Sequence, residues 1–382
     1  MKGIIDVRDW QVTIDFRTGK TCKLNPSIAP DLSRLAARLP YPGDQKDIGV
    51  DWVFNAANET IIRYDPNFLY LNFTQPLFNG LYRKRDERTR KITIEKILNG
   101  CRRIASENNY SLILVGMGNT VPLRGFISSD KIGGILISSP WSHFMSGILG
   151  AQEGDLEVLK SLPNVRNVVR KSDILSRHSL SENYINLLPD YILIAEKGYS
   201  FKGMFSHNRI MYQTEAFRET LPVYSEIGYP EHIEGVYDKL RTALSNGKKV
   251  MLVTIEGIGN EDMTIPYEKM NVLCDEFCYN GYTLVHTLVT GKSIYDCPLP
   301  PVHNMTIHKH IPRYYPFSMH DIAHCESSIA RDKNIRSAAI GCRSMVTHSI
   351  VNADINIECY MRAATNMGVM IGINEDKYKP IV

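Results

Sequence analysis

Four continuous apolar runs of strand length constrain the fold of this chain most. Stretches in which apolar residues recur at helical intervals separate them, as in residues 93–107 and 232–247. An uninterrupted apolar run is typical of a strand buried on both faces, which is the environment of an interior strand in a parallel sheet. The repeated order of strand and helix predicts an α/β fold with a mainly parallel sheet and helices on both faces. The predicted interior strands are residues 67–74, 112–115, 190–196 and 249–256.

The two ends of the chain carry further elements. Alternating runs on either side of Arg17-Thr-Gly19 predict an N-terminal β-hairpin, which a short helix follows. Toward the C-terminus, the spacing predicts a helix over 267–281, a strand over 282–291 and an irregular segment rich in proline and histidine over 296–318. We expect the hairpin and short helix over 1–50, an α/β core over 51–247, and a C-terminal α/β portion over 248–382. The last portion completes the same sheet or forms a second domain.

Composition narrows the class of partner. The formal net charge is +3 over 382 residues, so there is no strong signal for nucleic acid. No window reaches about eighteen uninterrupted apolar residues, which predicts no membrane span. The first residues carry charges and lack the apolar run of a signal peptide, and the eight cysteines are scattered. These features predict reduced thiols and a cytoplasmic location. The sequence is compatible with a homo-oligomer and does not decide the oligomeric state.

Histidines gather in the C-terminal third of the chain. His320 and His324 stand four residues apart on a predicted helix, so both rings can face one point. Neutral imidazole is a common ligand of divalent metals, and His308 and His310 lie in the preceding irregular segment with His303. One interpretation is therefore a divalent metal site; the alternative is a polar surface segment whose histidines bind nothing. The sequence identifies no cofactor beyond this possible divalent metal.

Three stretches resemble the alkaline phosphatase superfamily, in its phosphodiesterase and cofactor-independent phosphoglycerate mutase-like branches. They are FLYLNFTQPLFNGLY, LILVGMGN, and the region from LEVLKSLP to GYSFKG. The resemblance implies a phosphohydrolase fold in which metal-binding Asp and His residues follow the first two strands. This chain has Leu77 and Leu81 after the first strand, and Gly116 and Met117 after the second. The metal ligands are thus not preserved.

The GMGN stretch is expected to be a turn at the end of its strand. As a turn, it would resemble a metal-site scaffold without ligands, in which backbone N–H groups cradle an anion. The predicted ligand-binding residues are Gly116, Gly118 and Asn119.

The resemblance also implies a circular permutation. In the family, a strand ending in a metal-binding Asp precedes the hydroxyl nucleophile. VMLVTIEGIGNED followed by YTLVHTLVTG is similar, with Glu256 at the Asp position and Thr283 or Thr287 near the nucleophile. If the order is permuted, Glu256 and Thr287 face the GMGN stretch, and they are the predicted catalytic residues.

Three functions follow from these observations. The leading prediction is a degenerate phosphohydrolase-like protein that binds a small anionic or phosphorylated ligand, or has a structural role, without two-metal hydrolysis. The first alternative is a metal-dependent hydrolase that uses the histidines of 303–324 with Glu256. The second alternative is a non-enzymatic assembly protein, such as a viral one. The sequence does not decide whether the chain is an enzyme.

Overall fold

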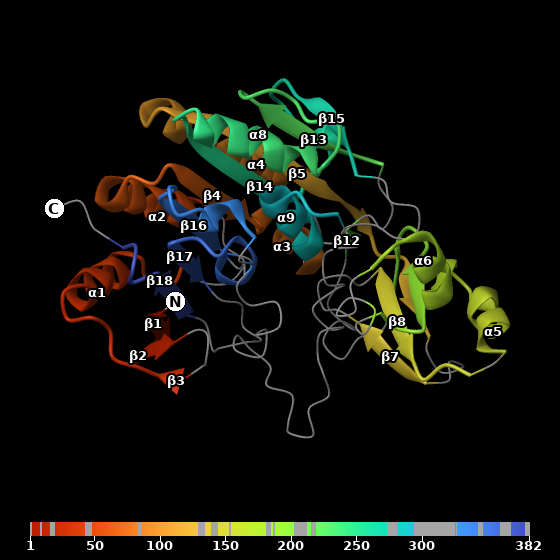
Figure 1. Cartoon of the computed structure of the whole chain (residues 1–382). Helices are drawn as coiled ribbons and strands as arrows, with labels where there is room; N and C mark the ends of the chain where they lie inside the picture. The colour runs from red at the N-terminus through yellow and green to blue at the C-terminus, as the bar shows by residue number, and fades with distance from the viewer. Residues whose placement is uncertain are drawn as a thin grey trace.

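A computed structural model shows one large sheet of twelve strands with helices on both faces and a smaller sheet beside it (Figure 1). The structure describes residues 2–378 apart from 8–9, 16–19, 43–47, 83–85, 129–133, 139–143, 153, 181–184, 186–187, 202–211, 215–218, 273–280, 294–324, 326, 343–346 and 360–367. The α/β class is confirmed.

The large sheet is mixed rather than mainly parallel. Its order is β15-β13-β5-β14-β4-β16-β17-β18-β1-β2-β3, and β12 pairs with β5. The five central strands, from β5 to β17, run parallel, whereas the ladders outside them are antiparallel. The bounds are β1 Lys2–Val7, β2 Trp10–Asp15, β3 Lys20–Thr21, β4 Phe68–Phe73, β5 Tyr110–Pro122, β12 Tyr212–Thr214, β13 Thr220–Ser225, β14 Lys249–Gly257, β15 Glu268–Asn271, β16 Ser337–Cys342, β17 Ile355–Cys359 and β18 Gly368–Ile373.

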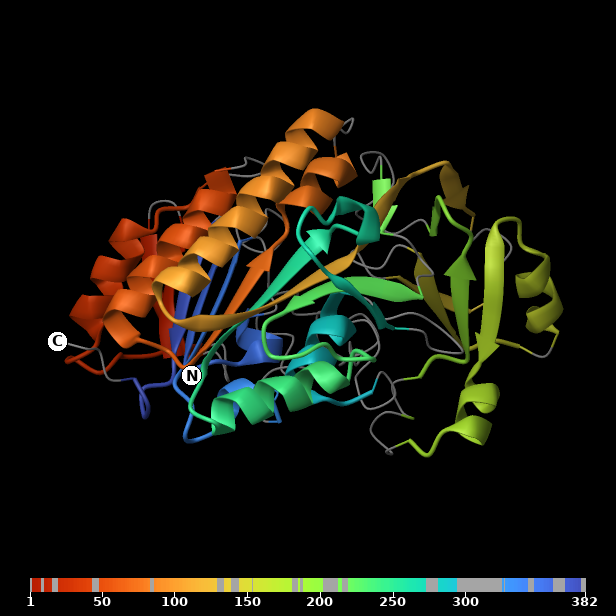
Figure 2. The ribbon, with the colours of Figure 1, turned by 90° about the horizontal axis from the view of Figure 1, so that it is seen from above.

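Two apolar cores lie on the two faces of the large sheet. On one face, α1 (Ala29–Arg38), α2 (Ile48–Tyr64) and α4 (Glu87–Glu107) bury their apolar sides. On the other face, α8 (Gly235–Ser245) and α9 (Gly281–Thr290) do the same. Figure 2 shows the red and orange helices on one side of the sheet and the green α8 on the other. Helix α3 (Gln75–Tyr82) follows β4 directly.

A separate antiparallel sheet lies in the middle of the chain. Its order is β7-β8-β10-β9, and α5 and α6 accompany it (Figure 1). Residues 190–196 contain a strand, as predicted, but this strand lies in an antiparallel sheet and not inside the parallel one. The prediction was wrong on this point because an apolar run carries no information about the direction of neighbouring strands. The bounds are β7 Ile135–Ser138, β8 Met145–Leu149, α5 Asp155–Ser161, β9 Val165–Arg170, α6 Lys171–Arg177 and β10 Tyr191–Ala195, with β6 Gly125–Ile127 pairing β11 Tyr199–Phe201 nearby.

Two predicted elements near the C-terminus differ from the prediction in the residues that the structure describes. The predicted helix over 267–281 contains the edge strand β15, which pairs with β13. The predicted strand over 282–291 is the helix α9. Alternating Thr and Val favoured a strand there, but Leu284 and Leu288 lie one turn apart and both are fully buried. Burial of a helical face overrides a weak local preference for strand.

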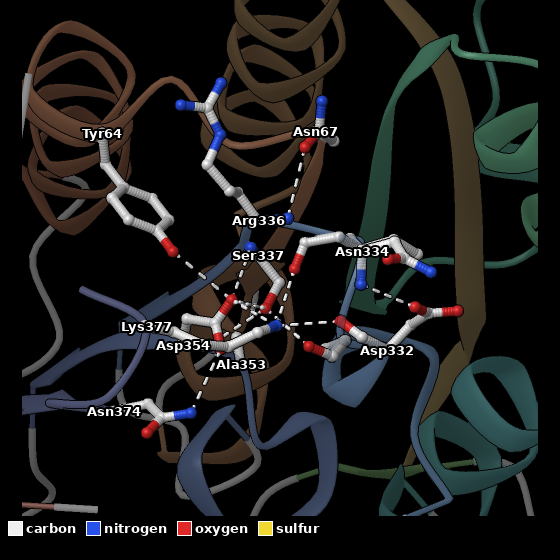
Figure 3. A network of polar contacts seen from close by, with 12 residues as sticks. Tyr64, Asn67, Asp332, Asn334, Arg336, Ser337, Ala353, Asp354, Asn374 and Lys377 are labelled. Carbon is white, nitrogen blue, oxygen red and sulfur yellow. Dashed lines mark hydrogen bonds and ion pairs between the residues drawn. The ribbon is translucent and has the colours of Figure 1, made fainter. Parts of the chain in front are cut away.

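The amino edge of the parallel strands holds a buried ion pair (Figure 3). Asp354, fully buried just before β17, accepts hydrogen bonds from the Ser337 backbone and hydroxyl, each 3.1 Å long, and lies 3.3 Å from Lys377 Nζ. Lys377 also donates to the carbonyls of Asp332 and Ile335. Asp354 and Lys377 thus join the C-terminal segment to the amino ends of β16 and β17, so we interpret the network as structural. Three short helices complete the described fold: the 3-10 helices η1 Asn260–Asp262 and η5 Ile329–Arg331, and the π-helix η6 Thr347–Val351.

Candidate functional site

The connections of two adjacent parallel strands leave the sheet on opposite faces. After β4 the chain passes through α4, whose buried residues belong to the core of the α2 face, and returns as β5. After β14 it passes through η1 and the edge strand β15, then through α9, which belongs to the opposite core, before it reaches β16. The carboxyl ends of β4 and β14 therefore form a topological switch point. Ligands of open α/β sheets bind at such points.

Polar side chains occupy this point. Tyr70 and Asn72 of β4 and Thr254 and Glu256 of β14 alternate with residues of the α2-face core, so they lie on the α9 face. The Tyr70 hydroxyl is 2.7 Å from Thr254 Oγ1. Asn72 Nδ2 donates to Thr254 Oγ1 at 2.9 Å and to Glu256 Oε1 at 3.3 Å. Four polar side chains thus form one connected group between the two strands.

Glu256 has an unusual acidity in this group. Burial among these residues raises the pKa of Glu256 to about 7, and the hydrogen bond from Asn72 lowers it only in part. A neutral carboxyl group both donates and accepts hydrogen bonds, whereas a carboxylate only accepts. Glu256 therefore changes between these two states near neutral pH. A carboxyl group tuned in this way at a switch point is a candidate functional group.

A second carboxyl group lies in the same row of the sheet. Asn72 of β4 pairs with Gly341 of β16, which pairs with Glu358 of β17. Paired residues of parallel strands point to the same face. Gly341 has no side chain, so nothing from β16 separates Asn72 from Glu358, which is fully buried. Asn72 Oδ1 is itself buried and has no hydrogen-bond partner within the described part of the chain.

The GMGN stretch is part of a strand, not a turn as expected. Strand β5 continues through it to Pro122. Gly118 has φ +103°, and the register between β14 and β5 shifts there, from Ile255 opposite Gly116 to Gly257 opposite Asn119. Glu256 thus lies in the irregular part of the ladder beside GMGN. The Gly118 N–H donates to the Ile258 carbonyl at 2.9 Å, so this group is occupied within the protein.

Arg90 of α4 holds the loop after β14. It forms an ion pair with Asp262, and both side chains are less than one-tenth exposed. The same guanidinium donates to the Gly257 carbonyl at 2.8 Å and to Asn119 Oδ1 at 3.4 Å. Asn119 also donates to Glu261. The predicted ligand-binding residue Asn119 is therefore part of a network that fixes the shape of the site.

The two predicted catalytic residues lie on the same face but in different elements. Glu256 is at the end of β14, and Thr287 is in α9, where it is fully buried; Thr283 is nearly so. Helix α9 begins beside GMGN, since an ideal Cβ on Gly281 would lie 3.9 Å from Met117 Cε. The catalytic role of Glu256 and Thr287 stays a prediction.

The positions that the family resemblance singled out carry apolar groups. Leu77 is buried at the start of α3, and Met117 belongs to the core on the α9 face. Leu81 also lies in α3.

The histidines of the predicted metal site, His303, His308, His310, His320 and His324, lie outside the described residues. Across the part of the chain that the structure describes, no group of three or more His, Cys, Asp or Glu side chains is placed to hold a metal ion. Within the same residues, no helix has the length and apolar character needed to cross a bilayer.

Sequence reasoning missed Asn72, Glu358 and Arg90. Polar residues inside short buried strands are the signal that identifies the first two, Asn72 in FLYLNF and Glu358 in INIEC. Nothing local marks Arg90, because its partner Asp262 is far away in sequence.

Comparison with protein-family models, with curated proteins and with solved structures finds no match to this chain.

Proposed function

We propose that this chain binds a small anionic or phosphorylated ligand at the carboxyl ends of β4 and β14, without two-metal hydrolysis. The observation that carries the proposal is the hydrogen-bonded pair of Asn72 and Glu256 at the switch point. Glu256 keeps a proton up to about neutral pH, because burial raises its pKa to about 7. In that state the pair carries no charge, and the Glu256 hydroxyl is a donor for an anion.

Two neighbouring features support an anion over a neutral ligand. The first residue of α9 lies against Met117, so the positive end of that helix dipole is close to the carboxyl edge of β5. Arg90 lies 3.4 Å from Asn119 on the adjoining strand and adds positive charge next to the site, although Asp262 neutralises part of it. Both features favour a negatively charged group.

The side chains at the expected ligand positions argue against the two-metal chemistry of the alkaline phosphatase superfamily, which the chain resembles in a permuted order. Leu77 and Met117 stand where the resemblance requires metal ligands, and neither side chain is a hard or imidazole ligand. We therefore propose a degenerate relative that keeps an anion site. The alternative is the metal-dependent hydrolase, in which Glu256 would ligate the metal as a carboxylate.

The pH dependence of binding distinguishes the two functions. We would titrate the full chain with inorganic sulfate, whose charge is constant between pH 6 and pH 8, by calorimetry. If a protonated Glu256 donates to the anion, affinity falls by about tenfold for each pH unit above 7, because the proton must be taken up again. The Glu256→Gln variant should lose this dependence, and Glu268→Gln, an exposed carboxyl group on β15, should keep it.

The opposite pH dependence would contradict the proposal. A metal ligand must be deprotonated, so Mn²⁺ or Zn²⁺ bound through Glu256 would bind more tightly as the pH rises. Metal binding of this kind that is lost in Glu256→Gln, together with no sulfate binding at pH 6, would establish the metal-dependent alternative instead.

A further inference from the structure

Two cysteines end neighbouring strands on the opposite face of the sheet from Glu256. Cys342 closes β16 and Cys359 closes β17, and the two are directly paired in the parallel register. Their Sγ atoms are 2.9 Å apart, and both side chains are buried in the core on the α2 face. Thr74 donates to the Cys342 carbonyl at 2.6 Å and holds the end of β16 in place. The two sulfur atoms are thus positioned to act together.

A buried amide without partners lies beside this pair. Gln75, the first residue of α3, is 3% exposed, and among the described residues neither its Oε1 nor its Nε2 has a hydrogen-bond partner. An ideal Cβ on Gly49 would lie 2.6 Å from Gln75 Nε2 and 2.9 Å from Cys342 Sγ, so the amide and the sulfur meet at the same point of α2. Burying unsatisfied polar groups is costly, and native proteins usually supply a partner.

The start of α2 adds a favourable field at this point. Gly49 belongs to the first turn of a helix of 17 residues, Ile48–Tyr64. The N–H groups of the first turn and the helix dipole place partial positive charge there. Partial positive charge therefore lies next to Cys342 Sγ. A glycine at position 49 is required for the sulfur to come this close to the helix.

We propose that Cys342, Cys359 and Gln75 bind one soft monovalent metal ion, Cu(I). On binding, each thiol loses its proton to solvent, and the two thiolates coordinate the ion. The Cys342 thiolate then accepts a hydrogen bond from Gln75 Nε2, and Gln75 Oε1 turns toward the cation, so both amide atoms gain partners. Rotation of the cysteine side chains about χ1 separates the sulfurs enough to admit the ion.

The choice of Cu(I) follows from the number and softness of the ligands. Thiolates select soft ions, and structural zinc takes four ligands. Here the described residues supply two soft sulfur ligands, which suits an ion of low coordination number, and the hard amide oxygen of Gln75 adds only a favourable dipole. A disulfide between the same cysteines would leave both amide atoms of Gln75 without partners, so the unpartnered amide favours a metal. This site is separate from the proposed anion site, because it lies on the other face of the sheet.

Competition between the reduced full chain and a chromophoric Cu(I) chelator, without oxygen, tests the proposal. We expect one Cu(I) per chain bound more tightly than any further Cu(I), and loss of at least tenfold in affinity in both Cys342→Ser and Cys359→Ser. Cys101→Ser removes a buried thiol in α4 and is the matched control, with affinity unchanged. Gln75→Leu should weaken binding and keep the stoichiometry. Equal binding by Cys342→Ser would overturn the proposal.

Alkylation of the wild-type chain gives a second measurement that does not depend on folding of the variants. The chain is incubated with one equivalent of Cu(I), with and without a stronger chelator, and is then treated with the alkylating reagent. Mass spectrometry of its peptides after denaturation identifies which thiols have been alkylated. Both thiols are buried, so the reagent reaches them only when the fold opens, and alkylation is followed over hours under native conditions. Bound Cu(I) should slow this alkylation of Cys342 and Cys359 relative to the metal-free chain. An unchanged alkylation rate of both thiols would contradict the proposal.

Discussion

Asn72 Nδ2 donates a hydrogen bond to Glu256 Oε1 across 3.3 Å, between two strands whose connections leave the sheet on opposite faces. This contact lies at the carboxyl edge of the five parallel strands. Two effects act on the acidity of Glu256: burial raises its pKa, and the amide donor lowers it. Burial has the larger effect, so the carboxyl group titrates near neutral pH.

Removal of the donor should move this titration upward. In Asn72→Leu the charged form of Glu256 loses its hydrogen bond, and we expect its pKa to rise above the value of about 7. The measurement is a titration followed by carbon NMR of the labelled carboxyl group. Asn334→Leu changes an exposed position at the other edge of the sheet. This variant is the control and should leave the pKa of Glu256 unchanged. A lower pKa in Asn72→Leu would show that the amide does not stabilise the carboxylate.

The same carboxyl group should make stability depend on pH. The folded pKa of about 7 is above the value of about 4.3 for an unfolded chain, so the folded state holds the proton more tightly. The stabilisation is complete below the unfolded pKa and is lost as the pH rises through the folded pKa. The free energy of unfolding of the wild type, relative to Glu256→Gln, should fall by about 3–4 kcal/mol between pH 4 and pH 8. Urea unfolding at both pH values measures this difference, and a constant difference would contradict the assignment.

Loss of the cation in the amino-edge network should destabilise the fold. Lys377→Met leaves the fully buried Asp354 without its ion-pair partner 3.3 Å away. Breaking a buried pair from one side costs about 3 kcal/mol, because one charge remains buried. Lys333→Met changes an exposed lysine of the same region and should cost less than about 0.5 kcal/mol. Chemical unfolding of both variants compares them, and equal costs would show that Asp354 does not depend on Lys377.

The central strands β4, β5 and β14 could be predicted because their apolar runs are buried on both faces. The antiparallel flanks could not, since an apolar run such as YILIA carries no information about the direction of its neighbour. The site was predicted in part: Glu256 stood out as an acid that ends a strand. Its partner Asn72 is 184 positions away in sequence, and only the parallel pairing of β4 with β14 brings the two together. Spacing along the chain does not encode such a contact.

Two glycines with similar backbone angles should respond differently to alanine. Gly257, at the end of β14, has φ +83°, and Gly247, after α8, has φ +77°. An added Cβ at Gly247 meets nothing within 4 Å, so Gly247→Ala should cost only the backbone strain of about 1–2 kcal/mol. At Gly257 the Cβ would lie 2.5 Å from the backbone nitrogen of Leu77, which cannot move without shifting the start of α3. Gly257→Ala should therefore cost more than Gly247→Ala in urea unfolding and should also weaken sulfate binding at the adjacent Glu256. Equal costs for the two variants would show that α3 does not pack against the end of β14 as the structure describes.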